Sequence, residues 1–154
     1  MSSVKTQSTV VTPETTLLNG KVFKQSLPAL QLPLGPDAPI LKRLLLPQGE
    51  LAQIYDAEEG IRYMAFIELL AGQVRGNHYH KVKEELVYVM RGEVSLSVVD
   101  IDSQARASVA LRTGDLAVIR TGIAHAYRTV EAGQAIEFSV ARFDPADIHR
   151  FPVG

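Results

Sequence analysis

The sequence has 154 residues, of which 46% are hydrophobic, and it carries 16 basic against 17 acidic residues. A chain of this length is expected to form one domain around one core. Because the charges nearly cancel and no basic stripe occurs, the composition argues against a nucleic-acid partner and against an anionic membrane surface. We therefore expect a small-molecule ligand or substrate, or a protein partner.

The chain contains no cysteine, which excludes disulfide bonds and thiolate metal sites. Any bound metal must then be held by imidazole and carboxylate groups. The N-terminal stretch lacks the apolar core of a signal peptide, and no segment approaches the length of a membrane span. These features predict a cytoplasmic protein with no membrane partner.

The first part of the chain differs in composition from the rest. A Ser- and Thr-rich start is followed by prolines at positions 13, 28, 33, 36 and 39, and proline is confined to edges and bulges of β-sheets. Only short apolar pieces lie between these prolines. We expect residues 1–40 to form an N-terminal arm with edge strands and residues 41–154 to form a barrel.

From Ile61 onward, short β-rich runs alternate with turn residues, a pattern typical of an all-β sandwich or barrel and not of βαβ units. The predicted strands are IRYMAFIELL, ELVYVM, EVSLSVVD, ASVAL, DLAVI, HAYRTV and AIEFSV. The predicted turns lie at Ala71-Gly72, at Arg91-Gly92, which reads as a hairpin turn, and at Gly114, Gly122 and Gly133. No run has helical periodicity.

Strand alternation predicts which side chains share a face of the sheet, and one face of a barrel is its interior. Glu85 shares a face with Val87, and His125 shares one with Tyr127. On the opposite face of the first of these strands, Leu86, Tyr88 and Met90 form an apolar stripe. We interpret that outer stripe as a subunit interface and expect a homodimer.

The end of the chain predicts a short helical turn. Asp144 followed by Pro145 reads as an N-cap with proline at the first helical position, before Phe151-Pro152. His149 lies near this turn and outside the strand patterns. We interpret it as a surface or interface histidine, or as a general base that closes over the site.

Three of the four histidines fall into one pattern. Residues 72–92 read G-x5-H-x-H-x4-E-x6-G, with His78, His80 and Glu85 as the polar members. An H-x-H pair on extended backbone points both imidazoles to one side, and Glu85 at the head of the next strand can complete the same site. Farther on, the stretch GDLAVIRTGIAHAYRT places His125 on another strand.

These two stretches resemble the paired motifs of the cupin superfamily, over about residues 60–142. The resemblance implies a double-stranded β-helix, the jelly-roll barrel of that family. It also implies one divalent transition metal per chain, held by His78, His80, Glu85 and His125. Three imidazoles and one carboxylate suit Fe, Mn, Ni, Co, Cu or Zn.

The second stretch departs from the family pattern, with Arg120 in place of the usual proline and Thr129 in place of the usual asparagine. Neither departure removes a ligand, but Arg120 alters the barrel mouth, where we expect it to bind substrate. The string RGNHYHK is similar to sugar-nucleotide-modifying cupins, including deoxysugar epimerases and keto-isomerases. There Arg75 would bind a substrate phosphate or carboxylate, because its planar fork binds such groups bidentately.

A metal in a dry barrel can polarise a carbonyl, activate water or bind oxygen, and the fold does not choose among these. Our leading hypothesis is a metal-dependent isomerase or epimerase of a small oxygenated substrate, such as a sugar or a nucleotide-linked keto-sugar. Tyr127 or His149 would move the proton, although Tyr127 also fits a core tyrosine with a satisfied hydroxyl. The alternatives are an iron-dependent dioxygenase and a non-catalytic small-molecule-binding protein.

Overall fold

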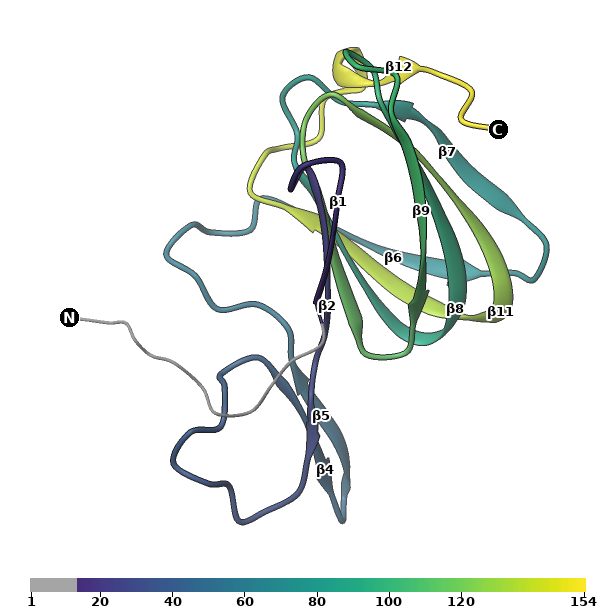
Figure 1. Ribbon diagram of the computed structural model, residues 1–154. Coiled ribbons are helices and arrows are strands. Elements are labelled where there is room, and N and C mark those ends of the chain that lie inside the picture. The colour runs from purple at the N-terminus through teal and green to yellow at the C-terminus, as the bar shows by residue number, and fades with distance from the viewer. Residues whose placement is uncertain (1–13) are drawn as a thin grey trace.

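The computed structural model describes residues 14–154, which are built almost wholly from β-strands (Figure 1). The strands are β1 (Glu14–Leu17), β2 (Val22–Ser26), β3 (Ala29–Leu30), β4 (Lys42–Leu46), β5 (Gly49–Gln53), β6 (Tyr63–Leu69), β7 (Val74–Tyr79), β8 (Glu85–Asp100), β9 (Arg106–Arg112), β10 (Asp115–Ile119), β11 (Ile123–Ser139) and β12 (His149–Arg150). The one helical element of these residues is a 3₁₀ turn, Pro145–Asp147. The all-β expectation is confirmed. No helix in this part of the chain is long and apolar enough to cross a membrane.

The long strands β8 and β11 form the frame of the barrel, because each belongs to both of its sides. The first part of β8 pairs with β10 and the later part with β9. β11 runs antiparallel to β8 and pairs with β7 through its first part and with β6 through its last part. The nine-stranded sheet thus folds over into two facing halves, as Figure 1 shows. This is the jelly-roll barrel that the resemblance implied.

β8 and β11 bend side by side, β8 at Gly92 and β11 at Gly133. A turn was predicted at each of these glycines, with a separate strand on either side. β8 and β11 each continue through the glycine, so the predicted hairpin turn at Arg91-Gly92 is wrong. The two backbones approach so closely that a Cβ on Gly133 would lie 1.8 Å from the carbonyl oxygen of Arg91. Register shifts between Thr129 and Ala135 accompany the bend. The glycines therefore mark a sheet corner, where strands pass from one half of the barrel to the other.

The other predicted turns lie between strands, as expected: Ala71-Gly72 between β6 and β7, Gly114 between β9 and β10, and Gly122 between β10 and β11. The short C-terminal turn is also present. Asp144 is its N-cap and accepts a hydrogen bond from the amide of Ala146 over 2.9 Å. After the turn, β12 pairs with β7 and closes one edge of the sheet.

The barrel interior is filled by apolar side chains that alternate along these strands. The buried cluster includes Val22, Ile67, Leu69, Val87, Val89, Leu96, Leu111, Ile119 and Tyr127. Burying one such aliphatic side chain contributes about 1.5–3 kcal/mol. Glu85 and His125 are also buried, at 2% and 1% exposure, so the predicted inward faces of the two strands are confirmed.

The outer apolar stripe of β8 is covered by the same chain. Tyr88 is 3% exposed and belongs to a second buried cluster with Leu27 and Phe138, and Leu86 and Met90 pack against that cluster. Residues of β5 and the loop after it complete the cover. The interpretation of this stripe as a subunit interface is therefore wrong, because side chains of the N-terminal segment (residues 14–61) already cover it. The homodimer itself stays a prediction.

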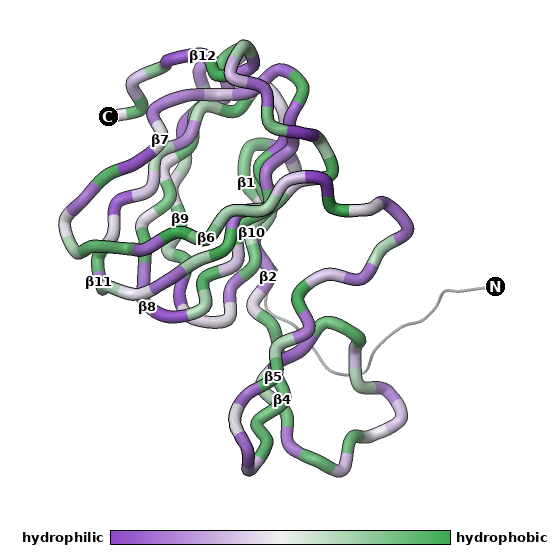
Figure 2. The backbone as a smooth tube through the Cα atoms, turned by 180° about the vertical axis from the view of Figure 1, so that it is seen from behind, coloured by the Kyte–Doolittle hydropathy of each residue, from purple (hydrophilic) through white to green (hydrophobic). Residues whose placement is uncertain are grey.

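The N-terminal segment divides between two sheets, and the division does not fall at residue 40. β1 and β2 belong to the nine-stranded sheet, with β1 at its edge, whereas β3, β4 and β5 form a separate three-stranded sheet. The β4–β5 hairpin projects beside the barrel in Figures 1 and 2. Residues 42–53, which were assigned to the barrel, lie in the separate three-stranded sheet. Residues 1–13 of the predicted arm lie outside the described residues.

Candidate metal centre

Four side chains from neighbouring strands converge at one end of the barrel. His78 lies on β7 directly opposite His125 of β11, His80 follows β7, and Glu85 is the first residue of β8. Each offers one ligand atom, and these four atoms all lie within 4.8 Å of one another. His80, Glu85 and His125 are buried, whereas His78 is half-buried. The structure thus brings together all four predicted ligands and leaves the cluster open on the side of His78.

Hydrogen bonds on the far side of two rings orient them toward the cluster. The Nδ1 atom of His80 lies 2.8 Å from the carbonyl oxygen of Asp147, and the Nδ1 atom of His125 lies 3.1 Å from that of Ile123. A carbonyl only accepts hydrogen bonds, so each Nδ1 carries a proton, and in the neutral ring the lone pair is on Nε2. Burial lowers the pKa of His125, but the neighbouring Glu85 carboxylate raises it above its ordinary value in the metal-free protein. Among the described residues, both Nε2 atoms are buried without a hydrogen-bond partner. A nitrogen atom that is buried, held in a fixed orientation and without a hydrogen-bond partner is suited to bind a metal ion.

Glu85 lies between the two orphaned nitrogens. Its Oε1 atom is 3.5 Å from Nε2 of His80 and 3.4 Å from Nε2 of His125, and its Oε2 atom accepts a hydrogen bond from Tyr127 over 2.7 Å. Burial alone would raise the pKa of Glu85, but His125 and the hydrogen bonds to the carboxylate lower that pKa well below its usual range. The carboxylate is therefore ionised.

The protonation states complete a ligand set that fits a divalent transition metal. Burial and the neighbouring imidazoles of His125 and His80 lower the pKa of His78 to about 4, so this ring is neutral at pH 7 and can donate a lone pair. Burial and Glu85 raise the pKa of Tyr127 well above its usual range, so its hydroxyl keeps its proton. Imidazole nitrogen and carboxylate oxygen are the donors that zinc, iron, nickel and related ions accept.

A β-bulge in β7 turns Arg75 toward the barrel. His78 pairs with His125, but Arg75 pairs with Tyr127, so the register shifts by one residue at Asn77. Without that extra residue, positions 75 and 78 would face opposite sides of the strand. Directly opposite residues share a face, and Arg75 and Tyr127 line the same small hollow with Ile67, Leu69 and Val87. Arg75 is itself exposed, so it lies where the barrel meets solvent.

Close backbone packing explains the glycine of the RGN segment. A Cβ on Gly76 would lie 2.6 Å from the carbonyl oxygen of His125, and Gly76 has a positive φ of +103°. Any other residue would push β7 away from β11 at the level of the cluster. The glycine therefore permits both the bulge and the close approach of His78 to His125.

Arg120 and His149, two of the predicted site residues, lie outside the cluster. The guanidinium of Arg120 donates to Glu84 over 2.8 Å and to the carbonyl oxygen of Gly20 over 3.2 Å. The ring of His149 stacks on Tyr79, 5.1 Å between centroids, and its Nε2 atom is 3.8 Å from the carboxylate of Asp147. Arg120 is thus paired at the β1–β2 turn. His149 contacts Asp147, which in turn contacts His80 of the cluster.

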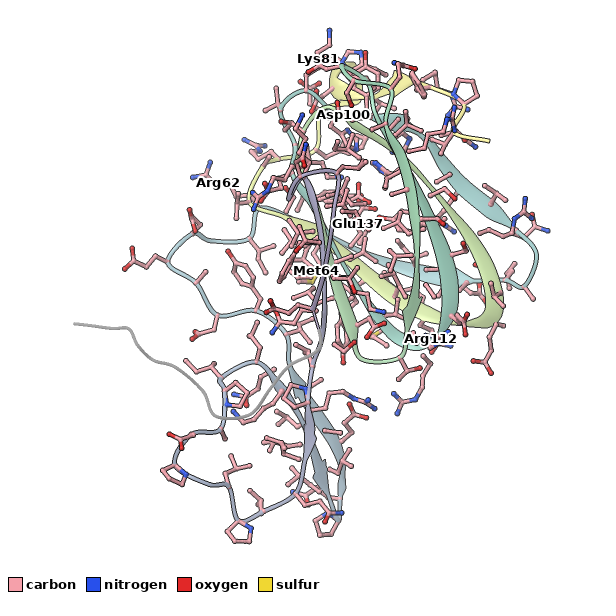
Figure 3. The ribbon with its side chains drawn as sticks, viewed as in Figure 1. Arg62, Met64, Lys81, Asp100, Arg112 and Glu137 are labelled. Atoms are coloured by element: carbon pink, nitrogen blue, oxygen red, sulfur yellow. The ribbon has the colours of Figure 1, made fainter. Side chains whose placement is uncertain are left out.

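Two charged residues beside the cluster were missed by the sequence analysis. Lys83 is 6% exposed, donates to the carboxylate of Glu137, and lies 3.9 Å from Oε1 of Glu85 and 4.5 Å from the ring centroid of Tyr63. Burial and the charge of Glu85 raise the pKa of Glu137. In Figure 3 Glu137 lies among the side chains of the barrel, whereas Arg112 points away from it.

The sequence offered only a weak signal for this buried pair. Glu137 alternates with Ile136 and Phe138 along β11, which suggests that the apolar residues face the core and that Glu137 faces water. In fact both faces of β11 are covered, one by the barrel interior and the other by the N-terminal segment. Lys83 stands in the charged run HKVKEE, which reads as a solvated turn.

Comparisons with known proteins agree with this fold. A family model described as "Cupin domain" matches residues 65–141. No curated protein sequence matches the chain.

Several solved structures are similar in fold, at low sequence identity. A dTDP-4-dehydrorhamnose 3,5-epimerase from Sulfolobus tokodaii has a TM-score of 0.68 and 15% identity, over 89% of this chain and 80% of that one. An epimerase from Legionella pneumophila in complex with dTDP-4-keto-L-rhamnose has a TM-score of 0.67 and 16% identity, over 90% and 76%. A variant 3,4-ketoisomerase from Thermoanaerobacterium thermosaccharolyticum in complex with TDP-4-keto-6-deoxyglucose has a TM-score of 0.63 and 17% identity, over 71% and 83%.

Proposed function

The chain belongs to the cupin domain family, and we propose that it is a metal-dependent isomerase or epimerase of a sugar nucleotide that carries a keto group. The observation that carries the proposal is the convergence of three imidazoles and one carboxylate, with two buried Nε2 atoms left without a partner. His78, His80, Glu85 and His125 would hold one divalent metal. When bound, such an ion supplies a positive charge that polarises a substrate carbonyl.

The substrate class is supported by the barrel mouth and by the relatives in fold. Arg75 is placed beside Tyr127 by the β7 bulge and is exposed to solvent. Its planar guanidinium matches a phosphate or diphosphate group bidentately. The similar structures are described as epimerases and ketoisomerases of dTDP sugars. A nucleotide diphosphate on Arg75 would direct the sugar toward the cluster.

The remaining residues of the site would hold protons and line an apolar interior. Tyr127 keeps its proton and donates it in a hydrogen bond to Glu85, so it orients the carboxylate. The buried pair of Lys83 and Glu137 can hold a proton within 3.9 Å of Glu85. Apolar side chains such as Ile67 and Leu69 surround the small hollow beside Arg75 and Tyr127, so the barrel interior next to Tyr127 is apolar.

Hydrogen exchange next to the keto group tests this function. The metal-loaded protein is incubated with TDP-4-keto-6-deoxyglucose in D₂O, and the sugar is followed by proton NMR. We expect deuterium to replace a proton on a carbon beside the carbonyl, because both epimerisation and keto-isomerisation pass through removal of that proton. The matched control is Arg75→Lys, which keeps the charge but not the planar fork and should raise KM more than it lowers kcat. Absence of both exchange and product in the loaded protein would contradict the proposal.

A further inference from the structure

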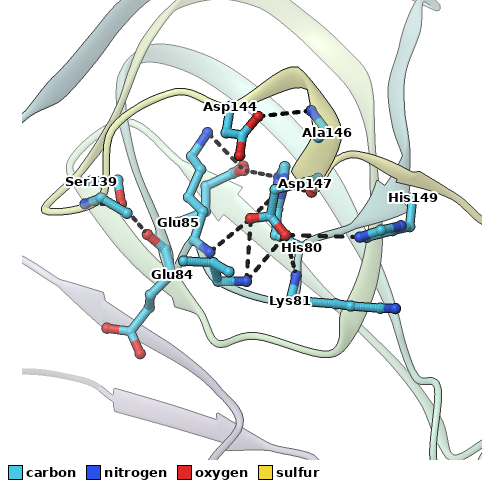
Figure 4. A network of polar contacts seen from close by, with 12 residues as sticks. His80, Lys81, Glu84, Glu85, Ser139, Asp144, Ala146, Asp147 and His149 are labelled. Atoms are coloured by element: carbon cyan, nitrogen blue, oxygen red, sulfur yellow. Dashed lines mark hydrogen bonds and ion pairs between the residues drawn. The ribbon is translucent and has the colours of Figure 1, made fainter.

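We propose that Asp147 is a positioning residue, which fixes His80 and the loop after it so that the C-terminal turn sets the metal affinity of the site. The inference rests on the metal-binding role proposed above. Asp147 is separated from His80 by 67 residues along the chain, yet the two are in contact. Figure 4 shows the turn that carries Asp147 lying directly over the segment between His80 and Glu85.

The carboxylate of Asp147 accepts hydrogen bonds from three consecutive backbone amides. Its Oδ1 atom accepts from Lys81 over 2.8 Å, its Oδ2 atom accepts from Lys83 over 3.0 Å, and Val82 lies 3.2 Å from both oxygens. Successive N–H groups that point to one side form a nest for an anion. Here the anion is a side chain of the same protein, 7% exposed. The loop that joins two predicted ligands is thus held by one buried carboxylate.

The main chain of the same residue fixes the ligand ring. The carbonyl oxygen of Asp147 accepts the Nδ1 proton of His80 over 2.8 Å, which directs Nε2 toward Glu85 and His125. Side chain and main chain therefore act on one ligand together. If the carboxylate released the loop, the turn would shift and the carbonyl would lose its position under the ring.

The turn is anchored well enough to serve as a support. Asp144 caps it, and β12 follows at once and pairs with β7. Beyond β12, the amides of Phe151 and Val153 donate to the backbone and side-chain oxygens of Asn77, each over 2.9 Å. Asn77 precedes His78, so the C-terminal segment supports both His78 on β7 and His80 just after it.

The arrangement requires two acceptor oxygens, which distinguishes Asp147 from an ordinary turn residue. In Asp147→Asn one oxygen becomes an NH₂ group, a donor that would face another N–H. The change is nearly isosteric, so it tests the loop contacts without opening a cavity. Asp144→Asn is the matched control, since it removes the same charge from the same turn while asparagine caps a helix about as well as aspartate.

Two measurements on full-length protein test the inference. Zinc affinity is measured by competition with a chelator, and amide hydrogen exchange of Lys81, Val82 and Lys83 is measured by NMR in metal-free protein. We expect Asp147→Asn to bind zinc about 10- to 100-fold more weakly, as for other outer partners of metal ligands. We also expect faster exchange of the three amides, with Leu96 in β8 still protected as a sign of intact folding. Asp144→Asn should leave both quantities unchanged.

The outcomes separate this inference from the proposed function. If wild-type protein binds no zinc, iron, nickel or cobalt, the proposed metal-binding role is wrong, and so is an effect of Asp147 on metal affinity. Amide exchange would still show whether the Asp147 carboxylate holds the loop. Wild-type protein that binds zinc, together with Asp147→Asn that binds it equally tightly, would overturn the positioning role alone. Unchanged exchange of the three amides would also overturn it.

Discussion

Tyr127 donates its hydroxyl proton to Oε2 of Glu85 over 2.7 Å, with both groups buried in the barrel. This bond leaves Oε1 free to face the two histidine nitrogens. Tyr127→Phe should destabilise metal-free protein by about 1–3 kcal/mol, because a buried carboxylate oxygen loses its donor. The measurement is urea unfolding.

Tyr127→Phe should nevertheless keep its metal, because all four ligands remain. Its rate of proton exchange with a keto-sugar nucleotide should fall, since the hydroxyl orients Glu85. A variant that loses both metal and stability would show instead that the hydroxyl is needed to form the ligand set at all.

Two histidine variants distinguish the cluster from its surroundings. His125→Ala should lose most of the bound metal, because His125 is buried and its Nε2 atom has no other partner among the described residues. His149→Ala should keep the metal, since His149 lies 3.8 Å from Asp147 and outside the cluster. Elemental analysis of purified protein measures both, with close to one metal per wild-type chain expected. Equal loss in both variants would mean that the fourth ligand has been assigned wrongly.

The convergence of the four side chains could be predicted because their spacing is local and strand geometry is regular. His78 and His80 are two residues apart, Glu85 begins the next strand, and the alternation of β11 turns His125 inward. The sequence could not reveal the support of Asp147 for His80, which depends on a contact across 67 positions. Nor could it show that the N-terminal segment covers Tyr88, because cover from a distant segment leaves no local pattern.

Glycine-based turn prediction failed at Gly133 for a physical reason that can be tested. Glycine occurs both at turns and where two backbones approach closely. At position 133 glycine is required because the carbonyl oxygen of Arg91 leaves no room for a Cβ atom. Gly133→Ala should cost about 1–3 kcal/mol or more, since the backbone must move to admit a methyl group. Gly60→Ala is the control, because a Cβ there meets nothing within 4 Å. Equal unfolding free energies for the two variants in urea would rule out the close contact.

An ion pair ties the β1–β2 turn to the end of β8, and it predicts a pH dependence. Lys21 donates to Asp100 over 2.7 Å, and this hydrogen bond lowers the pKa of Asp100 below its ordinary value of 3.8. A carboxylate with a lowered folded-state pKa stabilises the protein above its unfolded pKa, and that contribution is lost as the pH falls through the folded value. Asp100→Asn should therefore be less stable than wild type at neutral pH.

The difference between wild type and Asp100→Asn should shrink as the pH falls below the ordinary carboxyl range. Urea unfolding of the metal-free proteins at several pH values measures it. Lys21→Gln serves as the matched variant, because it removes the same contact from the other side. A stability difference that does not change with pH would mean that the ion pair is not its source.

Zinc-reconstituted protein distinguishes an isomerase from a dioxygenase, because the two reactions need different properties of the metal. Polarising a carbonyl needs only positive charge and an open coordination position, so zinc, nickel or cobalt should each support isomerisation under nitrogen. Oxygen chemistry needs a metal with an accessible redox change, which zinc lacks. We therefore expect zinc-reconstituted protein to exchange protons of a keto-sugar nucleotide without oxygen uptake. Turnover confined to the iron form, with one oxygen consumed per substrate, would overturn the isomerase and support a dioxygenase. The barrel and the cluster of His78, His80, Glu85 and His125 would stand in either case, because both reactions would use the same four side chains.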